Sequence, residues 1–477
     1  MRKRRIIRSL QLLNPKNLVR EVHVYGYHFS WKTHLLALLA TLAGMSVGSV
    51  LFQLKPIYFS CVLLAVCFML PILILEMYKG MFEQKRFADA VTYGEQILYS
   101  FQKNGKVVSA LKETKEIFED GRMKWVIEEA ISFLEDGNSN SEKGILKEAL
   151  EQIEQAYSCS KIHMIHELLI SCEELGGDVG NSILLVLNDI ELWKRREYSL
   201  QAGKKVQNRD NVISIIVSFV LCLITLYVLD GMSLLLPNKT VAGLFPLEVI
   251  QISSFLFILF MLFVFYKSRN SLTKNWLQRK ALYKEEYILA SYHLVMNDSE
   301  KKHWWQKILS KIPCYLAKKD INRELYTTLP QWLMQIALLL QNNNVQVSLM
   351  KSIEDASPVL QKELERLRER LEIRPNELQS YTEFCKNFDI PEVQSCMKML
   401  HAISESGTGN AQLQVNNLLQ RVQEMQNIAE DIRSGSDAFQ MRLLFSYPVL
   451  GVTIKLLVDM TVGMLYIFQL LSQVGGM

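Results

Sequence analysis

Two small groups of residues have the types and spacing that could do chemistry, and the first is a histidine pair. His163, His166 and Glu167 form the pattern His-x-x-His-Glu, which a helix would present within about one turn. Imidazole and carboxylate groups are zinc ligands, but the order differs from the His-Glu-x-x-His of zinc peptidases, and no third ligand is apparent. The pattern therefore favours a packed or solvated histidine pair over a metal centre.

The second group is a charged pair inside an otherwise apolar stretch near the C-terminus. Lys455 and Asp459 are four residues apart, so on a helix they share a face and can pair. Ionisable groups within a membrane span are costly and usually face protein or water. Two interpretations stay open here. Either the span is shifted toward the C-terminus and leaves Lys455 near the interface, or the two residues form a paired site inside a helix bundle.

Several other kinds of chemistry lack their motifs. No G-x-x-x-x-G-K-[ST] loop occurs, because Gly105-Lys106 and Gly203-Lys204 lack the upstream glycine and the following hydroxyl residue. The eight cysteines form no CxxC pair and have no companion histidines, which is typical of free, buried thiols. A net charge of +4 is too small to imply a nucleic-acid partner. We expect no catalytic site, no cofactor and no nucleic-acid binding.

The elements that carry these residues include long apolar blocks. Four blocks without charges have the length that a bilayer demands, about 18–25 residues, and a fifth contains Lys455 and Asp459. Four such blocks in one chain indicate a membrane protein. The predicted transmembrane helices cover residues 33–54, 56–75, 211–229, 249–266 and 443–471.

The distribution of lysine and arginine predicts the orientation of these spans. The link between the first two blocks holds only Lys55, and the link between the third and fourth holds only Lys239. Basic residues are dense before the first block and beside both long polar segments. The N-terminus and both segments are therefore expected in the cytoplasm of a bacterial cell, beneath the inner membrane, and the C-terminus outside.

The basic N-terminus admits two interpretations. Residues 2–20 have the pattern of a basic amphipathic helix, which could lie on an anionic leaflet, or they could be a loosely ordered tail. A removable signal peptide is not expected, because the first apolar block begins only near His34.

Two long polar segments, 80–210 and 268–441, show apolar residues at helical spacing, and each predicts a bundle of about five to seven helices. The predicted fold is an all-α membrane protein with two cytoplasmic helix-bundle domains attached to about five transmembrane helices. The expected organisation is a basic cytoplasmic segment 1–32, two spans in 33–77, a first helical domain 78–210, two spans in 211–267, a second helical domain 268–441, and a last span with an external C-terminus in 442–477.

The two segments also resemble each other, which predicts an internal repeat. Residues 101–112 align without a gap with residues 340–351. In both, a helix is expected to stop at a residue that tolerates the left-handed conformation, Gly105 or Asn344, before a second helix begins. This predicts an αα-hairpin. The coinciding pairs are Gln102/Gln341, Asn104/Asn343, Val108/Val347, Ser109/Ser348 and Lys112/Lys351.

A second shared feature follows in both segments, a predicted helix–glycine–helix corner with an acidic residue before the turn. Residues 172–180 contain Glu174 and Gly176, and residues 404–410 contain Glu405 and Gly407 at matching positions. Each motif alone is weak, since an acidic residue near a glycine at a helix end is common. Two motifs in the same order in two segments strengthen the prediction of a repeat.

With these motifs the chain resembles the type II secretion F-domain family, the inner-membrane platform proteins of type II secretion systems, type IV pili and Flp (tight adherence) pili. In that family an α-helical cytoplasmic domain is marked by a first hairpin of the form L-x-x-G-x-x-x-x-x-A-L. Residues 101–111, with Gly105 at the turn, are similar, with a slightly different spacing. A later G-E-x-x-G-type corner looks like the stretch from Glu173 to Gly176. A Tyr-Pro pair that opens the last span also fits, here Tyr447 and Pro448.

The second copy departs further from the family pattern. Asn344 replaces the hairpin glycine, and Ser404 stands where the glutamate would be, with Glu405 one place on. The resemblance therefore does not extend an acid-dependent role of this corner, such as binding a cation, to the second copy. The extra pair of spans before the first domain looks more like the Flp-pilus branch.

The resemblance implies a non-enzymatic platform that couples a cytoplasmic secretion or pilus ATPase to the assembly of pilin-like subunits. Implied partners are that ATPase, pilin-like subunits, other inner-membrane assembly proteins and further copies of the chain itself. The alternative is the membrane subunit of a transporter or a sensor with helical cytoplasmic domains. Lys455 and Asp459 are the intramembrane charges that such a transporter would use.

Overall fold

The structure is a computed structural model, and every regular element in the residues that it describes is a helix. The chain divides into two compact units. Unit 1 comprises Met1–Asp89, Trp193–Leu277 and Ala438–Met477, and unit 2 comprises Ala90–Leu192 and Gln278–Asp437. The described residues are 12, 14–136, 144–175, 179–234, 244–272, 276–277, 284–296, 304–340, 343–353, 356–375, 377–388, 390–405 and 411–474.

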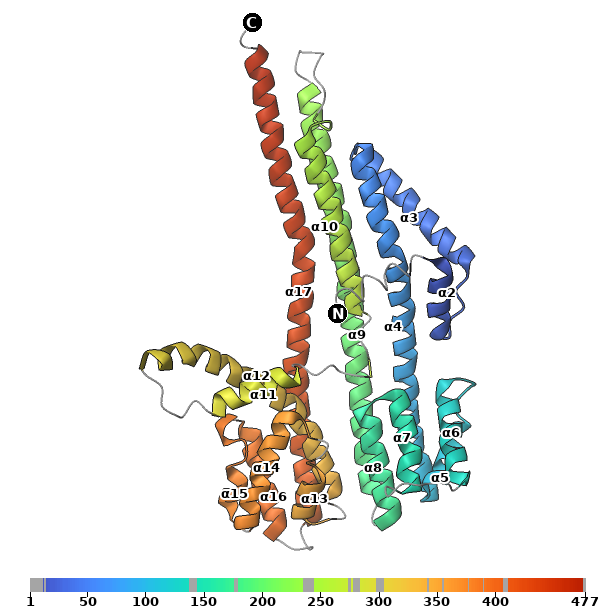
Figure 1. Cartoon of the computed structure of the whole chain (residues 1–477), viewed down its shortest axis with the longest axis vertical. Coiled ribbons are helices and arrows are strands. Elements are labelled where there is room, and N and C mark those ends of the chain that lie inside the picture. The colour runs from blue at the N-terminus through green and yellow to red at the C-terminus, as the bar shows by residue number, and fades with distance from the viewer. Residues whose placement is uncertain are drawn as a thin grey trace. The chain divides into compact units, whose positions relative to one another are not determined.

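Within the described residues, helices follow one another along the chain (Figure 1). In chain order they are α2 (Pro15–Val24), α3 (Trp31–Leu51), α4 (Pro56–Asn104), α5 (Val107–Lys115), α6 (Arg122–Asp136), α7 (Ile145–Tyr157), α8 (Ser160–Leu175), α9 (Val179–Leu234), α10 (Glu248–Leu272), α11 (Glu285–Met296), α12 (Trp304–Leu339), α13 (Val345–Lys351), α14 (Pro358–Ile373), α15 (Leu378–Thr382), the 3-10 helix η2 (Lys386–Phe388), α16 (Pro391–Glu405) and α17 (Ala411–Val474).

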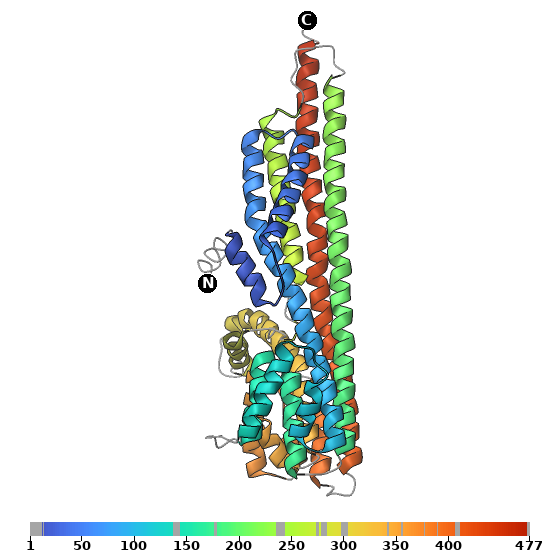
Figure 2. The same cartoon turned by 90° about the vertical axis from the view of Figure 1, so that its right-hand side faces the viewer.

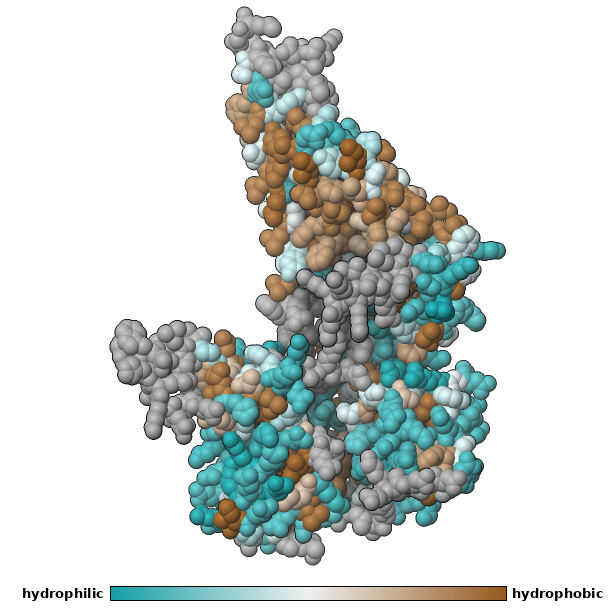
Figure 3. Space-filling model, viewed as in Figure 1, coloured by the Kyte–Doolittle hydropathy of each residue, from teal (hydrophilic) through white to brown (hydrophobic). Residues whose placement is uncertain are grey.

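Within the described ranges, five helices are long and apolar enough to cross a membrane, one for each apolar block, which indicates a membrane protein. Brown, hydrophobic residues cover this part of unit 1, whereas the surface of unit 2 is mostly hydrophilic (Figure 3). An apolar surface of this kind is stable against lipid and unstable against water. The candidate spans lie in Trp31–Leu51, Pro56–Asn104, Ile183–Met232, Glu248–Asn270 and Leu443–Gln469.

Three helices extend far beyond the apolar blocks. α4, α9 and α17 have 49, 56 and 64 residues, and each passes without a break from one unit into the other. Figure 2 shows α9 and α17 as unbroken ribbons. In α4 and α9 the sequence changes from apolar to charged while the helical spacing of the buried residues continues, so composition changes along these two helices and backbone conformation does not.

Inside unit 1, an apolar core joins α9, α10 and α17 to the start of α4. One buried polar residue fixes the links between helices at the end of this core. Gln251, 1% exposed, accepts a hydrogen bond from the backbone N–H of Lys55 at 2.9 Å. Its amide donates to the carbonyls of Gln53 at 2.9 Å and Phe245 at 2.7 Å. A side-chain ion pair between Lys55 and Glu248 lies beside it.

α2 packs against the protein with its apolar side. Asn14 accepts a hydrogen bond from the backbone of Lys16 at the N-terminus, and Pro15 occupies the first helical position. Leu18 and Val22 are completely buried against apolar residues of α4. Most of residues 2–20 lie outside the described residues, so both interpretations of that segment stay predictions. Protein covers the apolar side of α2 itself.

Unit 2 holds both predicted repeats. The first consists of the end of α4, α5 to α8 and the start of α9, and the second of α11 to α16 with the start of α17. The core of the second repeat contains buried residues from all of its helices. Met164 and Leu185 of the first repeat pack against that core, so the two repeats share apolar contacts within one unit.

Candidate functional site

The hairpin of the first repeat turns at Gly105, as the sequence predicts. Its φ is +65°, a conformation that glycine adopts at little cost. The N-cap residue of α5, Lys106, makes no side-chain cap. Instead, Glu173 at the end of α8 accepts a hydrogen bond from the backbone N–H of Val107 at 2.8 Å, and Lys106 Nζ lies 3.5 Å from the same carboxylate. The hairpin and the later corner therefore meet.

In the second repeat, the N-terminus of the second hairpin helix is capped by a residue of the turn itself. Asn344 is the N-cap of α13, and its side chain accepts a hydrogen bond from the backbone N–H of Val347 at 2.9 Å. Its φ is −71°, in the extended region, so the prediction of a left-handed residue here is wrong. The reason is that an N-cap side chain can reach the helix amides only from extended backbone.

The gapless alignment of the two hairpins is also wrong by one residue after the turn. Before the turn, Tyr93 and Trp332 occupy matching buried positions, as the alignment requires. After the turn, the second repeat is one residue shorter, because Asn344 both ends the turn and caps the next helix. The buried positions of α5 match those of α13 as the pairs Val107/Val345, Ala110/Ser348, Leu111/Leu349 and Thr114/Ser352.

The two corners differ in their acidic residues. Gly176 and Gly407 lie outside the described residues, and Glu174 is described only as part of the α8 backbone. Glu405, at the end of α16, has a side chain that is 61% exposed and lies 3.7 Å from His401. It has no counterpart of the contact that Glu173 makes with the hairpin.

The predicted histidine pair belongs to a buried polar network in the first repeat. His163 and His166 each place Nδ1 2.8 Å from the carboxylate of Glu154, which comes from α7 and not from their own helix. The hydroxyl of Tyr93 on α4 lies 2.8 Å from Nε2 of His166. Tyr93 and His166 are 0% and 1% exposed. Glu167, the expected neighbour, pairs with Lys147 at 2.8 Å.

The protonation states of this network follow from its burial. Burial lowers the pKa of His166, against the opposing effect of Glu154. Burial also raises the pKa of Glu154, but the hydrogen bonds from His163 and His166 outweigh it and lower that pKa to about 2. An ionised carboxylate can only accept, so both imidazoles donate from Nδ1 and neutral His166 accepts from Tyr93. Tyr93, His166 and Glu154 follow the order of a catalytic triad, but the Tyr93 hydroxyl is buried from solvent.

The charged pair of the last span is enclosed by unit 1. Lys455 Nζ lies 2.6 Å from Asp459 Oδ1 and donates to Ser253 Oγ of α10 at 2.8 Å, and the two charged side chains are 1% and 0% exposed. This geometry supports the paired site inside a bundle, not a lysine at the interface. Gly451 lies one turn before Lys455, and Gly463 lies one turn after Asp459. Because these glycines have no side chain, Phe260 and Leu229 approach the backbone of α17, which packs closely against its neighbours.

The Tyr-Pro motif lies at the start of the same span. Pro448 is buried within α17, and Tyr447 is partly buried. Lys267 of α10 places its ammonium 5.5 Å from the centre of the Tyr447 ring, within the range of a cation–π contact. The motif therefore ties α17 to the end of α10.

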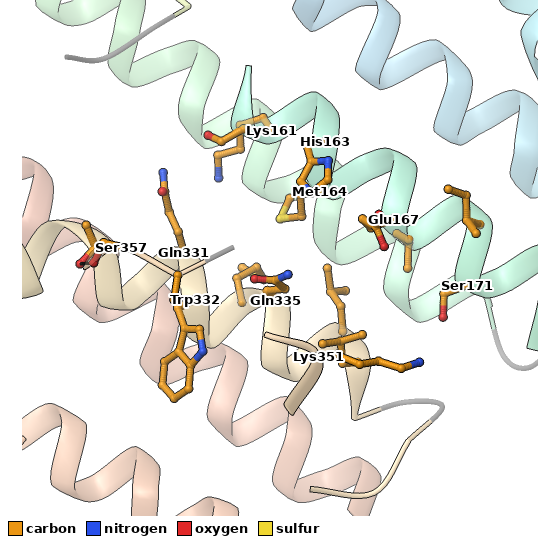
Figure 4. Close-up of a pocket in the computed structure, with 18 of the residues that line it drawn as sticks. Lys161, His163, Met164, Glu167, Ser171, Gln331, Trp332, Gln335, Lys351 and Ser357 are labelled. Carbon is orange, nitrogen blue, oxygen red and sulfur yellow. Dashed lines mark hydrogen bonds between the residues drawn. The ribbon is translucent and has the colours of Figure 1, made fainter. Parts of the chain in front are cut away.

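Unit 2 contains a groove of about 650 Å³ between the repeats. Figure 4 shows His163, Met164 and Glu167 of α8 on one wall and Gln331 and Gln335 of α12 on the other. Lysines also line it, but Lys147 pairs with Glu167 and Lys161 pairs with Asp189. Lys351 lines the groove as well, so the walls present amide, thioether and apolar groups together with the charge of this lysine.

Within the described ranges, no group of three or more histidine, cysteine, aspartate or glutamate residues is arranged to hold a metal ion. Comparisons with protein families, with curated proteins and with solved structures found no match for this chain.

Proposed function

We propose that the chain is a non-enzymatic inner-membrane platform that couples a cytoplasmic ATPase to the assembly of pilin-like subunits into a pilus or pseudopilus. In this proposal unit 2 lies in the cytoplasm and contacts the ATPase, and the spans of unit 1 contact the membrane-embedded subunits. The C-terminus is external. Other inner-membrane assembly proteins and further copies of the chain complete the assembly.

The observation that carries this proposal is the continuity of α4, α9 and α17. A protein that passes mechanical work from a soluble motor to membrane-embedded subunits needs connections that do not bend freely. An unbroken α-helix is such a connection, because each backbone group is hydrogen-bonded to the next turn. Three helices of 49, 56 and 64 residues join the apolar spans to the helical repeats.

The contact between Glu173 and the hairpin supports the family resemblance from a second direction. The two motifs on which that resemblance depends are 66 residues apart, yet they meet through one hydrogen bond in the first repeat. A shared structural role explains why both motifs would recur together. The missing contact in the second repeat agrees with the departures of its sequence from the pattern.

The test is to interrupt the helices without changing any contact surface. A Gly-Ser linker is inserted into α9 between Val206 and Asp210, and the matched control receives the same linker in the link 235–243. Filament assembly or secretion and co-purification with the cognate ATPase are measured in cells. We expect the α9 linker to abolish assembly while membrane insertion and ATPase co-purification persist, and the control to assemble normally.

Normal assembly with the α9 linker would overturn the coupling role. ATP hydrolysis by the purified chain alone would overturn the non-enzymatic role.

A second candidate function, ion or solute transport, is favoured by one observation, the buried pair of Lys455 and Asp459. The two functions differ in what the pair must do. As a structural pair it should survive exchange of its members, Lys455→Asp with Asp459→Lys, better than neutralisation by Asp459→Asn. Neutralisation leaves an uncompensated buried lysine, at a cost of about 3–5 kcal/mol. Solute flux through the purified protein in liposomes, abolished by both changes, would favour the transporter.

A further inference from the structure

The outward side of α2 carries a line of basic side chains. Lys16, Arg20 and His23 follow at intervals of four and three residues, so they share one side of the helix, and all three are exposed. The opposite side is apolar and is buried through Leu18 and Val22. Because protein covers the apolar side, α2 is held in place with its cations directed away from the core of unit 1.

The position of α2 along the membrane normal follows from the span beside it. α3 begins at Trp31, whose side chain is 58% exposed, and hydrophilic surface over α2 adjoins the brown surface of α3 (Figure 3). Aromatic residues gather at this level, as they do at the headgroup layer of membranes. The ring contacts are Tyr25–Phe82 at 5.2 Å, Tyr27–Tyr78 at 5.6 Å and Phe29–Tyr78 at 5.5 Å.

From this arrangement we propose that the Lys16–Arg20–His23 face of α2 binds the phosphate groups of anionic phospholipids. A phosphodiester offers a negative charge and several acceptor oxygens, and ammonium and guanidinium groups donate to it strongly. The single acidic residue of α2, Glu21, lies on the flank of this face. The proposal requires only that the chain spans a membrane, so it stands independently of the platform function and of the side on which the N-terminus lies.

A lipid headgroup fits this face better than free phosphate does. The side chains of Lys16, Arg20 and His23 lie along an open helix surface, whereas a soluble anion is usually held by converging donors in a concave site. An open line of cations can bind headgroups because the bilayer presents them at high local concentration. Each lysine or arginine near an anionic surface contributes about a fivefold increase in association.

The experiment uses the full-length chain reconstituted in bilayers of phosphatidylcholine with phosphatidylglycerol. Electron spin resonance with spin-labelled phosphatidylglycerol and phosphatidylcholine gives the preference of the protein for the anionic lipid. The test variant is Lys16→Gln with Arg20→Gln. The matched control, Lys362→Gln with Arg368→Gln, removes two exposed charges from α14, whose side chains are 47% and 45% exposed. Lys16→Arg with Arg20→Lys keeps the charge and reports on folding.

We expect the preference for phosphatidylglycerol to fall by up to about 25-fold in the test variant, at about fivefold for each of its two charges, and the preference of the unaltered chain to weaken with salt. The control and the charge-preserving variant should match the unaltered chain. An unchanged preference in the test variant overturns the proposal. Displacement of the spin-labelled lipid by millimolar glycerol phosphate would instead assign the face to a soluble phosphate and would also overturn it. A salt-independent preference would point to a protein or apolar contact.

Discussion

The two repeats of unit 2 bury different polar groups at matching positions of their helices. Tyr93 and His166 of the first repeat correspond to Trp332 and Met397 of the second, on matching faces of α4 and α12 and of α8 and α16. Conversely, the second repeat buries a polar residue, Glu363 on α14, where the first repeat has an apolar one. The matching buried position on α6 is Ala130. Each repeat therefore forms its bundle without the polar network of the other.

The network of the second repeat is as complete as that of the first. Glu363 is 3% exposed and accepts hydrogen bonds from the Tyr292 hydroxyl at 2.6 Å and from the backbone N–H of Cys385 at 3.2 Å. Arg366 lies 3.3 Å away at the surface. Burial and the Glu363 carboxylate raise the pKa of Tyr292, so its proton stays in place. The comparison teaches that a helical bundle of this kind tolerates buried charge only where each repeat supplies its own partners.

The largest effect is expected where a buried carboxylate serves two donors. Glu363→Leu leaves the Tyr292 hydroxyl and the Cys385 N–H without their acceptor, at a cost of about 3–5 kcal/mol. Amide hydrogen exchange of α14 and α16 in the full-length chain measures this loss. The matched control is Ala130→Leu, which tests whether the volume of leucine is tolerated at the same position of the first repeat. A loss below about 1 kcal/mol for Glu363→Leu would show that the network is not coupled to packing.

A smaller loss is expected when the first repeat receives a residue of the second. His166→Met leaves the Tyr93 hydroxyl and one Glu154 oxygen unpaired, at a cost of about 1–3 kcal/mol. Adding Tyr93→Phe removes one of these unpaired groups, so the double variant should be more stable than the single one. Hydrogen exchange of α8 measures both. If the second substitution adds its own full cost, the two side chains act independently and the network has no cooperative role.

The caps of the two hairpins offer the next contrast. Glu173→Ala removes the carboxylate that accepts from the backbone N–H of Val107 at the N-terminus of α5 and should cost about 1 kcal/mol, as the loss of an N-cap does. Glu405→Ala should cost close to nothing, because that side chain is largely exposed. Exchange protection of α5 and α13 reports each helix separately. Equal losses at both corners would mean that the two hairpins are held in the same way after all.

The smallest effect concerns pH, and it should be confined to the first repeat. Because the pKa of His166 is lowered in the folded chain, the unfolded chain binds more protons as the pH falls below about 6.5, so stability falls there. For one proton, the free energy of unfolding changes by at most about 1.4 kcal/mol per pH unit. Glu154 adds a second loss, from its ordinary range down to about pH 2. Exchange protection of α8 between pH 7 and 5.5 should decrease, and in His166→Met it should not.

The sequence predicted the features that depend on local pattern. The apolar blocks predicted five helices that can span a membrane, and Gly105 predicted the first hairpin turn. Features that depend on partners distant in the sequence were missed. Glu154 has no motif that joins it to His163 and His166, because it lies on another helix. The one-residue shift after Asn344 was hidden because exposed pairs such as Lys112 and Lys351 coincide by identity without sharing a position.

The continuity of α4 could have been recognised from sequence. Charges begin at Glu76, and this change of composition by itself predicts the start of a separate domain. The buried positions continue at helical spacing through Phe87 to Phe101, and the stretch contains no proline. Hydropathy indicates whether lipid or water surrounds a helix, whereas the spacing of its apolar residues indicates how far the helix extends along the chain.

The buried amide of Gln251 has a consequence for the synthesis of the chain. Gln251 accepts a hydrogen bond from the backbone N–H of Lys55, and Lys55 leaves the ribosome 196 residues before Gln251 does. At about 5–20 residues per second, the turn after α3 waits about 10–40 s for its partner. During that interval the first two spans must be held in the bilayer with these backbone groups bonded to water or to an insertion factor. The link 52–55 is therefore completed late, and the first helical hairpin of the membrane unit reaches its final form only after the fourth span has been made.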